Sequence, residues 1–384
     1  MDWDLECLAC GTRAEATGLP TVCACGQPWL VRYQAGRRTD GQTGRGMWRW
    51  NQWLPLLPGE APVSLGEGDT PLLSVPRLGA EIGLPDCWVK DESTNPTGSF
   101  KARGLSAAVT RAKAGGATAF TLPTAGNAGV AAAAYGARAG IPVRVYAPRT
   151  TPPAILAQIV TFGADLRLLD GHIGDCGKAS RAYAAESGAF DLSTLREPYR
   201  IEGKKTLGLE LAEGFDWVLP DAIVYPTGGG TGLIGMWKAF NELKAEGRVT
   251  GAARLFTVQA SGCAPMIRAF ESGADRAVPW ENPETRAAGL KVPGPLGDRL
   301  MLRALRETAG GVVAVEDPEL IEAAERGSSL EGIDFAPEGG ASIAAAARLR
   351  RQGVLRERDR VVLFNTGAGW LYREPRDCLT RVPG

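Results

Sequence analysis

The sequence predicts an α/β fold with mostly parallel strands, and three observations indicate it. Short apolar runs alternate along the chain with longer tracts of helical character. Glycine-rich loops join several of these runs to the tract that follows, as in units of strand, loop and helix. The length of 384 residues exceeds the usual size of one domain, so we expect two α/β domains and a small additional segment.

The strand-like runs follow one another through the middle and the C-terminal part of the chain. The predicted strands are 117–123, 141–148, 164–170, 221–225, 253–260 and 360–363. In open parallel sheets, ligands bind at the carboxyl ends of the strands. The loops that follow these runs are therefore where functional residues are expected.

The balance of charge excludes some classes of partner. Lys and Arg together number 43, and so do Asp and Glu, so no basic surplus favours nucleic acid or an anionic membrane. The acidic start "MDWDLECLAC" does not resemble a signal peptide, and no apolar stretch is long enough to cross a bilayer. We expect a soluble cytoplasmic protein that acts on a small molecule.

The stretch "NPTGSFKARG", residues 95–104, places a lysine in an unusual position. Pro96 and Gly98 predict a turn, and Ser99 is a good N-cap for a helix that ends at two glycines, 115–116. Lys101 would then stand at the helix start, where the helix dipole disfavours its charge. This favours a reactive amine, and the alternative is a solvated surface lysine.

Three glycine-containing loops follow predicted strands: 123–129, 226–233 and 364–370. In the second, "PTGGGTGL", three glycines and a threonine precede a helix, so backbone N–H groups can form an anion-binding nest. The loop lacks the Lys-Ser/Thr ending of a Walker loop and the spacing of a dinucleotide site. The loop therefore favours the binding of a single phosphate. The alternative is a tight turn between strand and helix whose glycines serve only close packing.

A phosphate nest together with a reactive lysine predicts pyridoxal 5'-phosphate as the cofactor. The motifs "NPTGSFKARG", "PTAGNAG", "PTGGGTGL" and "NTGAG" stand in the order and spacing of the fold type II pyridoxal-phosphate enzymes. The set most closely resembles the threonine synthase branch, from about residue 67 to residue 370. That resemblance implies two three-layer domains with mostly parallel sheets, with the cofactor between them.

The resemblance also implies roles for individual residues. Lys101 matches the Schiff-base lysine, Asn127 the asparagine that binds the phenolic oxygen, and Thr366 the hydroxyl residue that faces the ring nitrogen. A hydroxyl there, rather than a carboxylate, does not hold the ring nitrogen protonated and suits elimination and replacement better than transamination. The implied cofactor-binding residues are Phe100, Lys101, Asn127, Gly228, Gly229, Gly230, Thr231 and Thr366.

The substrate is less clearly indicated. The segment "EPYRIEGKKTLGLEL" resembles a threonine synthase segment whose arginine, here Arg200, helps to bind the substrate phosphate, although a surface ion pair is the alternative. The loop residues Thr124, Ala125 and Gly126 are further candidates for substrate binding. Three positions depart from the family pattern, where a lysine, a threonine and a histidine are common: Ile155, Ala128 and Ala368.

The function implied is that of a threonine synthase, a carbon–oxygen lyase that converts O-phospho-L-homoserine and water to L-threonine and phosphate. Lys101 would be its catalytic base. A threonine or serine dehydratase, or a β-replacement enzyme of the same fold, is the alternative within the family, and "SFKARG" in place of "SFKDRG" leans that way. A binding protein that has lost catalysis is the alternative from another class.

The N-terminal segment contains Cys7 and Cys10 as a C-x2-C pair, followed by Cys23 and Cys25 as C-x-C. Four thiolates in a turn-rich segment can form a tetrahedral structural zinc site, with reduced free thiols as the alternative. The family often begins with such a zinc-ribbon-like segment. The expected divisions are 1–40 for this segment, 41–97 plus 208–384 for the large domain and 98–207 for the small one. The family is usually homodimeric.

Overall fold

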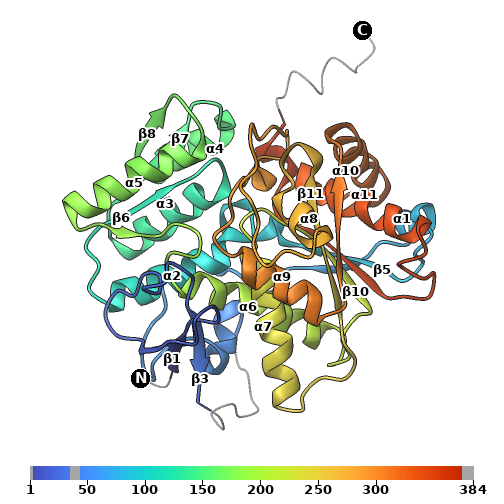
Figure 1. Ribbon diagram of the computed structural model, residues 1–384, viewed down its shortest axis with the longest axis horizontal. Helices are drawn as coiled ribbons and strands as arrows, with labels where there is room; N and C mark the ends of the chain where they lie inside the picture. The colour runs from blue at the N-terminus through green and yellow to red at the C-terminus, as the bar shows by residue number, and fades with distance from the viewer. Residues whose placement is uncertain (1–2, 35–43, 374–384) are drawn as a thin grey trace.

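The computed structural model describes residues 3–34 and 44–373, so parts of the predicted segments 1–40, 41–97 and 208–384 lie outside it. In the described residues the chain forms three separate sheets, of six, four and three strands. The four-stranded sheet and the six-stranded sheet lie on opposite sides of the molecule, each with its own helices (Figure 1). This confirms the prediction of an α/β fold.

The six-stranded sheet has the order β12-β11-β10-β13-β5-β4. All neighbouring strands are parallel except β4, which pairs antiparallel with β5. Its strands are β4 (Leu72–Ser74), β5 (Cys87–Asp91), β10 (Ala222–Pro226), β11 (Arg254–Ala260), β12 (Gly311–Val315) and β13 (Val361–Asn365). The sheet thus combines an early part of the chain with its C-terminal part.

The four-stranded sheet is wholly parallel, in the order β8-β7-β6-β9. Its strands are β6 (Phe120–Pro123), β7 (Val143–Pro148), β8 (Asp165–Leu169) and β9 (Phe190–Asp191). Phe120 and Leu122 face the helices of one core, whereas Thr121 between them contacts Ser180 on the opposite face at 3.0 Å between the two hydroxyl oxygens. Helices therefore cover both faces of this sheet.

The helices follow the alternation that the sequence predicts. Those of seven residues or more are α1 (Pro76–Ile82), α2 (Lys101–Ala114), α3 (Asn127–Ala139), α4 (Pro153–Thr161), α5 (Ile173–Ser187), α6 (Tyr199–Gly214), α7 (Thr231–Ala245), α8 (Pro265–Glu271), α9 (Asp298–Glu307), α10 (Asp317–Glu331) and α11 (Pro337–Arg351), besides a 3-10 turn at Met47–Trp53. None of the helices in the described ranges has the length and apolar character of a membrane span.

The large sheet is also buried on both faces. Tyr225 of β10 faces a core that includes residues of α6 and α7, and the neighbouring Val224 faces a second core that includes residues of α11. The near-continuous apolar character of β10 follows from this double burial. The predicted boundary after residue 207 falls within α6, a single helix that packs against both α2 and α7.

The three-stranded sheet is formed by the N-terminal segment and is antiparallel. Its strands are β1 (Trp3–Glu6), β2 (Arg13–Glu15) and β3 (Leu30–Tyr33), in the order β2-β1-β3. The sheet lies near the start of α6, where Tyr199 joins its small apolar core and Tyr33 donates a hydrogen bond to Glu202 at 2.6 Å (Figure 1). The segment is thus packed on the helix that carries Arg200.

The six predicted strands are all present, but other elements depart from expectation. The sequence analysis does not predict the N-terminal sheet or the strands β4, β5, β9 and β12. Helix α2 begins at Lys101 as expected, yet its N-cap is Phe100 without a side-chain cap, so the prediction that Ser99 caps it was wrong. The Ser99 backbone instead forms an isolated bridge with Gly367, and its hydroxyl oxygen has no partner among the described residues.

Candidate functional site

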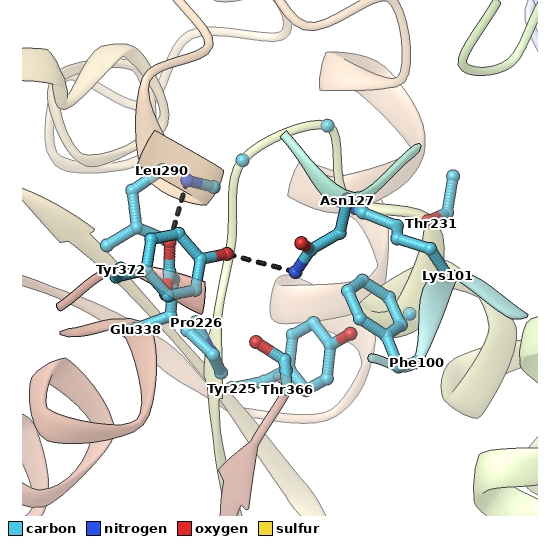
Figure 2. Close-up of a pocket in the computed structure, with 15 residues that line it drawn as sticks. Phe100, Lys101, Asn127, Tyr225, Pro226, Thr231, Leu290, Glu338, Thr366 and Tyr372 are labelled. Carbon is cyan, nitrogen blue, oxygen red and sulfur yellow. Dashed lines mark hydrogen bonds between the residues drawn. The ribbon is translucent and has the colours of Figure 1, made fainter. Parts of the chain in front are cut away.

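A pocket is lined by the end of β10, by the starts of helices that pack on both larger sheets and by the loops beside them, and Figure 2 shows its lining side chains. All eight residues that the sequence analysis assigned to a cofactor line this one pocket: Phe100, Lys101, Asn127, Gly228, Gly229, Gly230, Thr231 and Thr366.

The topology explains why residues so far apart in sequence meet here. Asn127 opens α3 just after β6, Thr231 opens α7 just after β10, and Thr366 directly follows β13. β10 and β13 are parallel neighbours in the six-stranded sheet, so the loops that follow them converge at one edge, and the start of α3 meets this edge from the four-stranded sheet. The Phe100 N–H donates to the Thr366 carbonyl at 3.0 Å, which ties the start of α2 to the end of β13.

Lys101 combines a half-buried side chain with an aromatic neighbour. Its Nζ lies 4.2 Å from the centroid of the Phe100 ring. Burial is the largest cause that lowers the pKa of Lys101 from its usual 10.5 to about 7, and the charge of Arg200 lowers it further, while Glu338 opposes the shift. The expectation of a weakly basic lysine agrees with this pKa, but burial, rather than the helix dipole, is the main cause.

The loop before α7 brings backbone close to the pocket. Gly230 has a φ of 80°, and a Cβ there would lie 2.1 Å from Met301 Sδ. A Cβ on Gly228 would lie 2.3 Å from the Gly289 carbonyl oxygen. Only glycine fits at these two positions. The first N–H groups of the 15-residue α7 therefore stand free at the pocket, as anion binding at a helix N-terminus requires.

We expect Gly230→Ala to weaken the affinity for a phosphate-bearing ligand by about tenfold or more, because the left-handed backbone and the clash with Met301 would displace the loop. The measurement is a titration of apoprotein with pyridoxal 5'-phosphate. Gly247→Ala is the matched control, since Gly247 also has positive φ, 64°, but lies beyond the other end of α7 with no heavy atom within 4 Å of its added Cβ. Equal affinities of the two variants would contradict the role of the loop.

Several buried polar atoms in the pocket lack partners among the residues that the structure describes. They are Asn127 Oδ1, the Tyr225 hydroxyl and Glu338 Oε2. Unsatisfied buried polar atoms are costly, so their clustering in one pocket indicates a polar ligand that satisfies them. A weakly basic amine, free helix N–H groups and these atoms fit pyridoxal 5'-phosphate, with its aldehyde, phosphate, ring nitrogen and phenolic oxygen.

Three pocket side chains with polar groups were not predicted from the sequence. Tyr225 is the last residue but one of β10, just before the glycine loop, so its position next to that motif was an available signal. Glu338 lies in the first turn of α11, and Tyr372 follows the last described 3-10 turn, Gly369–Leu371. The Tyr372 hydroxyl accepts a hydrogen bond from Asn127 Nδ2 at 3.0 Å (Figure 2). No motif in the sequence marks Glu338 or Tyr372.

The four residues predicted to bind substrate do not line the pocket. Thr124, Ala125 and Gly126 form the loop that leads to Asn127, and the Thr124 hydroxyl accepts hydrogen bonds from the backbone of Gly126 and Gly129, each at 3.1 Å. Ile155, at the position where the family often has a lysine, is fully buried near Gly126. The loop is therefore backed by an apolar side chain.

Arg200 is also buried, with about 1% of its surface exposed, so it does not form the surface ion pair considered as its alternative. Its Nη1 donates to the Leu192 carbonyl at 2.8 Å, and its Nε has no partner within the described protein. Of the two lysines that follow it, Lys204 donates to the Phe100 carbonyl, whereas Lys205 pairs with Glu202. Arg200 and Lys204 thus place two further basic groups beside the pocket.

The N-terminal cysteines converge as their spacing predicts. The four Sγ atoms of Cys7, Cys10, Cys23 and Cys25 all lie within 4.8 Å of one another, and no disulfide joins them. Cys7 and Cys25 are 3.5 Å apart, and Cys10 and Cys23 are 3.6 Å apart. Tetrahedral zinc with bonds of about 2.3 Å to sulfur requires separations of about 3.8 Å. The donor set therefore fits a zinc ion.

Comparison with known proteins agrees with the geometry of the site. Residues 63–367 match the family described as "Pyridoxal-phosphate dependent enzyme". The chain is 35% identical over 331 residues to a threonine synthase of Methanosarcina acetivorans, covering 86% of this chain and 80% of that one. It is 31% identical over 372 residues to a threonine synthase of Methanocaldococcus jannaschii, with 95% and 92% covered.

Solved structures share the fold at lower identity. The processed form of threonine deaminase isoform 2 from Solanum lycopersicum has a TM-score of 0.69 at 19% identity, with 94% of this chain and 98% of that one covered. Maize serine racemase has a TM-score of 0.70 at 20% identity, with 81% and 90% covered. Both likenesses bear on the fold alone.

Proposed function

Because the chain belongs to the pyridoxal-phosphate dependent enzymes and, within them, to the threonine synthases, we propose that it converts O-phospho-L-homoserine and water to L-threonine and phosphate. The observation that carries this proposal is the half-buried, weakly basic Lys101 in one pocket with the glycine loop of Gly228–Gly230. When bound there, pyridoxal 5'-phosphate would supply an electron sink for the carbanion formed at the substrate α carbon.

The chain offers a partner for each polar group of the cofactor. We assign the aldehyde to Lys101, the phosphate to the N–H groups at the start of α7 with Thr231, and the phenolic oxygen to Asn127. Thr366 faces the ring nitrogen in this assignment, and Phe100 forms part of the wall. The unpartnered Asn127 Oδ1 and the positive φ of Gly230 support the assignment, because each is costly without a ligand.

Lys101 is the proposed base. With a pKa of about 7, half of its amine is unprotonated near neutral pH, so it can take the proton from the substrate α carbon. It can then return protons to the carbon skeleton after phosphate leaves from the γ carbon and water adds at the β carbon. A buried site excludes bulk water during these transfers.

We assign substrate binding to the loop of Thr124, Ala125 and Gly126 and to Arg200. Arg200 Nε is buried without a partner, and its charge acts on Lys101, so the guanidinium lies near the reacting amine. A guanidinium with a free donor is suited to a phosphate group. It would supply part of the positive charge that Ile155 cannot.

The alternative is a dehydratase or β-replacement enzyme on the same cofactor site. The observation in its favour is that Lys101 is the single cationic side chain among the residues that line the described pocket, which also holds the carboxyl of Glu338. Product analysis with O-phospho-L-homoserine, L-threonine and L-serine as separate substrates distinguishes the two. Threonine and phosphate from the first support the proposal, and a keto acid with ammonia from the others, without threonine, would replace it.

We further propose that Cys7, Cys10, Cys23 and Cys25 hold a structural zinc ion. Four thiolates leave no open coordination position, so the ion would stabilise the N-terminal segment and take no part in catalysis. The clustering of the four sulfur atoms supports this proposal.

We expect one zinc ion per chain by elemental analysis, and loss of that zinc together with a lower melting temperature in Cys23→Ser. Cys176→Ser is the control, because Cys176 is buried outside the cluster and should leave the zinc content unchanged. Purified protein without zinc, whose melting temperature does not respond to added zinc, would refute the site.

We also propose a cytoplasmic location and a homodimer. We propose the same division of the chain as above, into segments 1–40, 41–97 plus 208–384 and 98–207. These proposals rest on the family resemblance. The position of the pocket, lined by helices of both larger sheets, supports a cleft that closes over the substrate.

A further inference from the structure

Glu338 is a buried carboxyl that the proposed chemistry leaves without a role. About 3% of its surface is exposed, and it lines the pocket. Its Oε1 accepts a hydrogen bond from the Gly289 N–H at 2.7 Å, whereas its Oε2 has no partner among the described residues. One oxygen therefore fixes the side chain and the other is free at the pocket.

The fold holds this carboxyl on the same wall as Thr366. The Ala336 N–H, just before α11, donates to Asn365 Oδ1 at 3.1 Å, and a Cβ on Gly339 would lie 2.6 Å from that oxygen. The first turn of α11 is thus pressed against the residue that precedes Thr366. Figure 2 shows Glu338 across the pocket from Lys101.

Gly289 links Glu338 to the glycine loop from the other side. A Cβ on Gly289 would lie 2.7 Å from Glu338 Oε1, and the Gly289 carbonyl lies close to Gly228. Glu338 therefore stands between the proposed phosphate site and Thr366. In pyridoxal 5'-phosphate the ring nitrogen lies on the side of the ring opposite the aldehyde. With the aldehyde assigned to Lys101, Glu338 would therefore face the side of the ring that carries the nitrogen.

We propose that Glu338 Oε2 shares a proton with the ring nitrogen of the bound cofactor and so gives that nitrogen an acidic partner in addition to Thr366. The proton lies on either the carboxyl oxygen or the nitrogen, and no bond to carbon is made or broken. This inference rests on the cofactor site of the proposed function but not on the identity of the amino-acid substrate.

The electrostatic surroundings agree with a shared proton. Burial raises the pKa of Glu338, while the charge of Lys101 acts in the opposite direction. Tyr372 is the other titratable group whose charge is coupled to this carboxyl, and its own pKa is raised by burial. A carboxyl with a raised pKa and one free oxygen can donate a hydrogen bond to a pyridine nitrogen or accept its proton.

The consequence concerns the electron sink. The sequence expectation, based on Thr366 alone, was a ring nitrogen that is not held protonated. A proton shared with Glu338 withdraws electrons from the ring and would stabilise carbanionic states at the substrate more than a hydroxyl does. Thr366 and Glu338 together would then determine how strongly the cofactor ring withdraws electrons from the substrate.

The test is ¹⁵N NMR of the full-length protein reconstituted with pyridoxal 5'-phosphate labelled at the ring nitrogen. We expect the upfield resonance of a protonated pyridine in the unmodified protein and a shift toward the unprotonated position in Glu338→Gln and Glu338→Met. We also expect the affinity for the cofactor to fall about tenfold in Glu338→Met and less in Glu338→Gln, whose amide can still donate to the nitrogen.

Glu322→Gln is the matched control, because Glu322 is exposed on the neighbouring α10 and should leave the resonance in place. An unprotonated ring nitrogen in the unmodified protein, or a protonated one that both Glu338 variants leave unchanged, would overturn the inference. Failure of the protein to bind the cofactor would instead refute the proposed function. Binding and protonation without threonine production would refute the substrate assignment alone.

Discussion

Lys101→Ala should lower turnover by about 10³-fold or more and abolish the visible absorbance of lysine-bound cofactor. The amine is the proposed attachment point for the cofactor and the proposed base, and general acid–base catalysis alone contributes about 10²–10⁴-fold. The absorbance spectrum and the steady-state rate measure these two losses separately. Lys178→Ala is the control, because the Lys178 side chain is 77% exposed in a surface ion pair with Asp175.

The pH dependence of cofactor capture tests whether the pKa of Lys101 is lowered in the folded protein. An amine attacks an aldehyde only when it is unprotonated, so the rate at which apoprotein captures pyridoxal 5'-phosphate should rise with pH, reach half of its maximum at about pH 7 and level off at higher pH. Burial and Arg200 place the midpoint there by disfavouring the charged form. A midpoint near 10.5, the usual lysine pKa, would show that Lys101 is solvated.

Arg103→Met should destabilise the fold by about 3–5 kcal/mol, because it leaves buried carboxylates without their counter-charge. Arg103 is fully buried and lies two residues after Lys101 on α2. Its guanidinium donates to both oxygens of Glu92, at 2.7 and 2.9 Å, and to both oxygens of Glu210, at 2.8 and 2.5 Å. These contacts join α2 to the turn that follows β5 and to α6.

The loss of folding stability in Arg103→Met should also depend on pH. Burial alone would raise the pKa of Glu92, but Arg103 overcomes it and the pKa is lowered, so the ion pair stabilises the fold above the usual pKa of 4.5 and less as the pH falls. Without Arg103 the raised pKa would make the folded state lose stability as the pH rises. Denaturant unfolding at about pH 5 and about pH 8 should therefore show the larger difference between the two proteins at the higher pH.

Arg326→Met is the matched control for this experiment. Arg326 also forms a two-point contact with a glutamate, Glu81, but the two side chains are 55% and 40% exposed. Exposed ion pairs contribute about 0–1 kcal/mol. Equal losses in the two variants would contradict the assigned role of burial.

Most of the proposed cofactor-binding residues were predictable because they belong to short motifs at the ends of predicted strands. Thr231 and Thr366 follow β10 and β13 at one edge of the six-stranded sheet, whereas Asn127 follows β6 of the four-stranded sheet, so the strands alone did not show that Asn127 meets the other two. Lys101 lies in a turn-helix motif of its own. In each case the local sequence fixes both the backbone conformation and the residue type.

Glu338 and Tyr372 could not be predicted in this way. Glu338 reaches the pocket because α11 packs against the end of β13 and because residue 289 is a glycine, and both are tertiary contacts between distant segments. Tyr372 is placed by the turn after β13 and by its hydrogen bond to Asn127. Neither residue stands in a pattern that marks a site.

Strand β5 is an element of the fold that could not be predicted from its local sequence. Its sequence CWVKD carries a lysine in the middle of a buried strand, which opposes a strand prediction. Lys90 is tolerated because its Nζ pairs with Glu210 at 2.8 Å and donates to the Thr70 carbonyl. That compensation comes from α6, more than 100 residues away in the sequence, and a local pattern does not contain it.

The proposed reaction is tested by incubating the protein, loaded with pyridoxal 5'-phosphate, with O-phospho-L-homoserine in ¹⁸O-labelled water. Both products are then analysed by mass spectrometry. We expect equal amounts of phosphate and threonine, with ¹⁸O in the threonine hydroxyl and none in the phosphate, because the carbon–oxygen bond breaks and water adds to carbon. Homoserine with labelled phosphate, or no reaction in a protein that shows the cofactor absorbance, would contradict it.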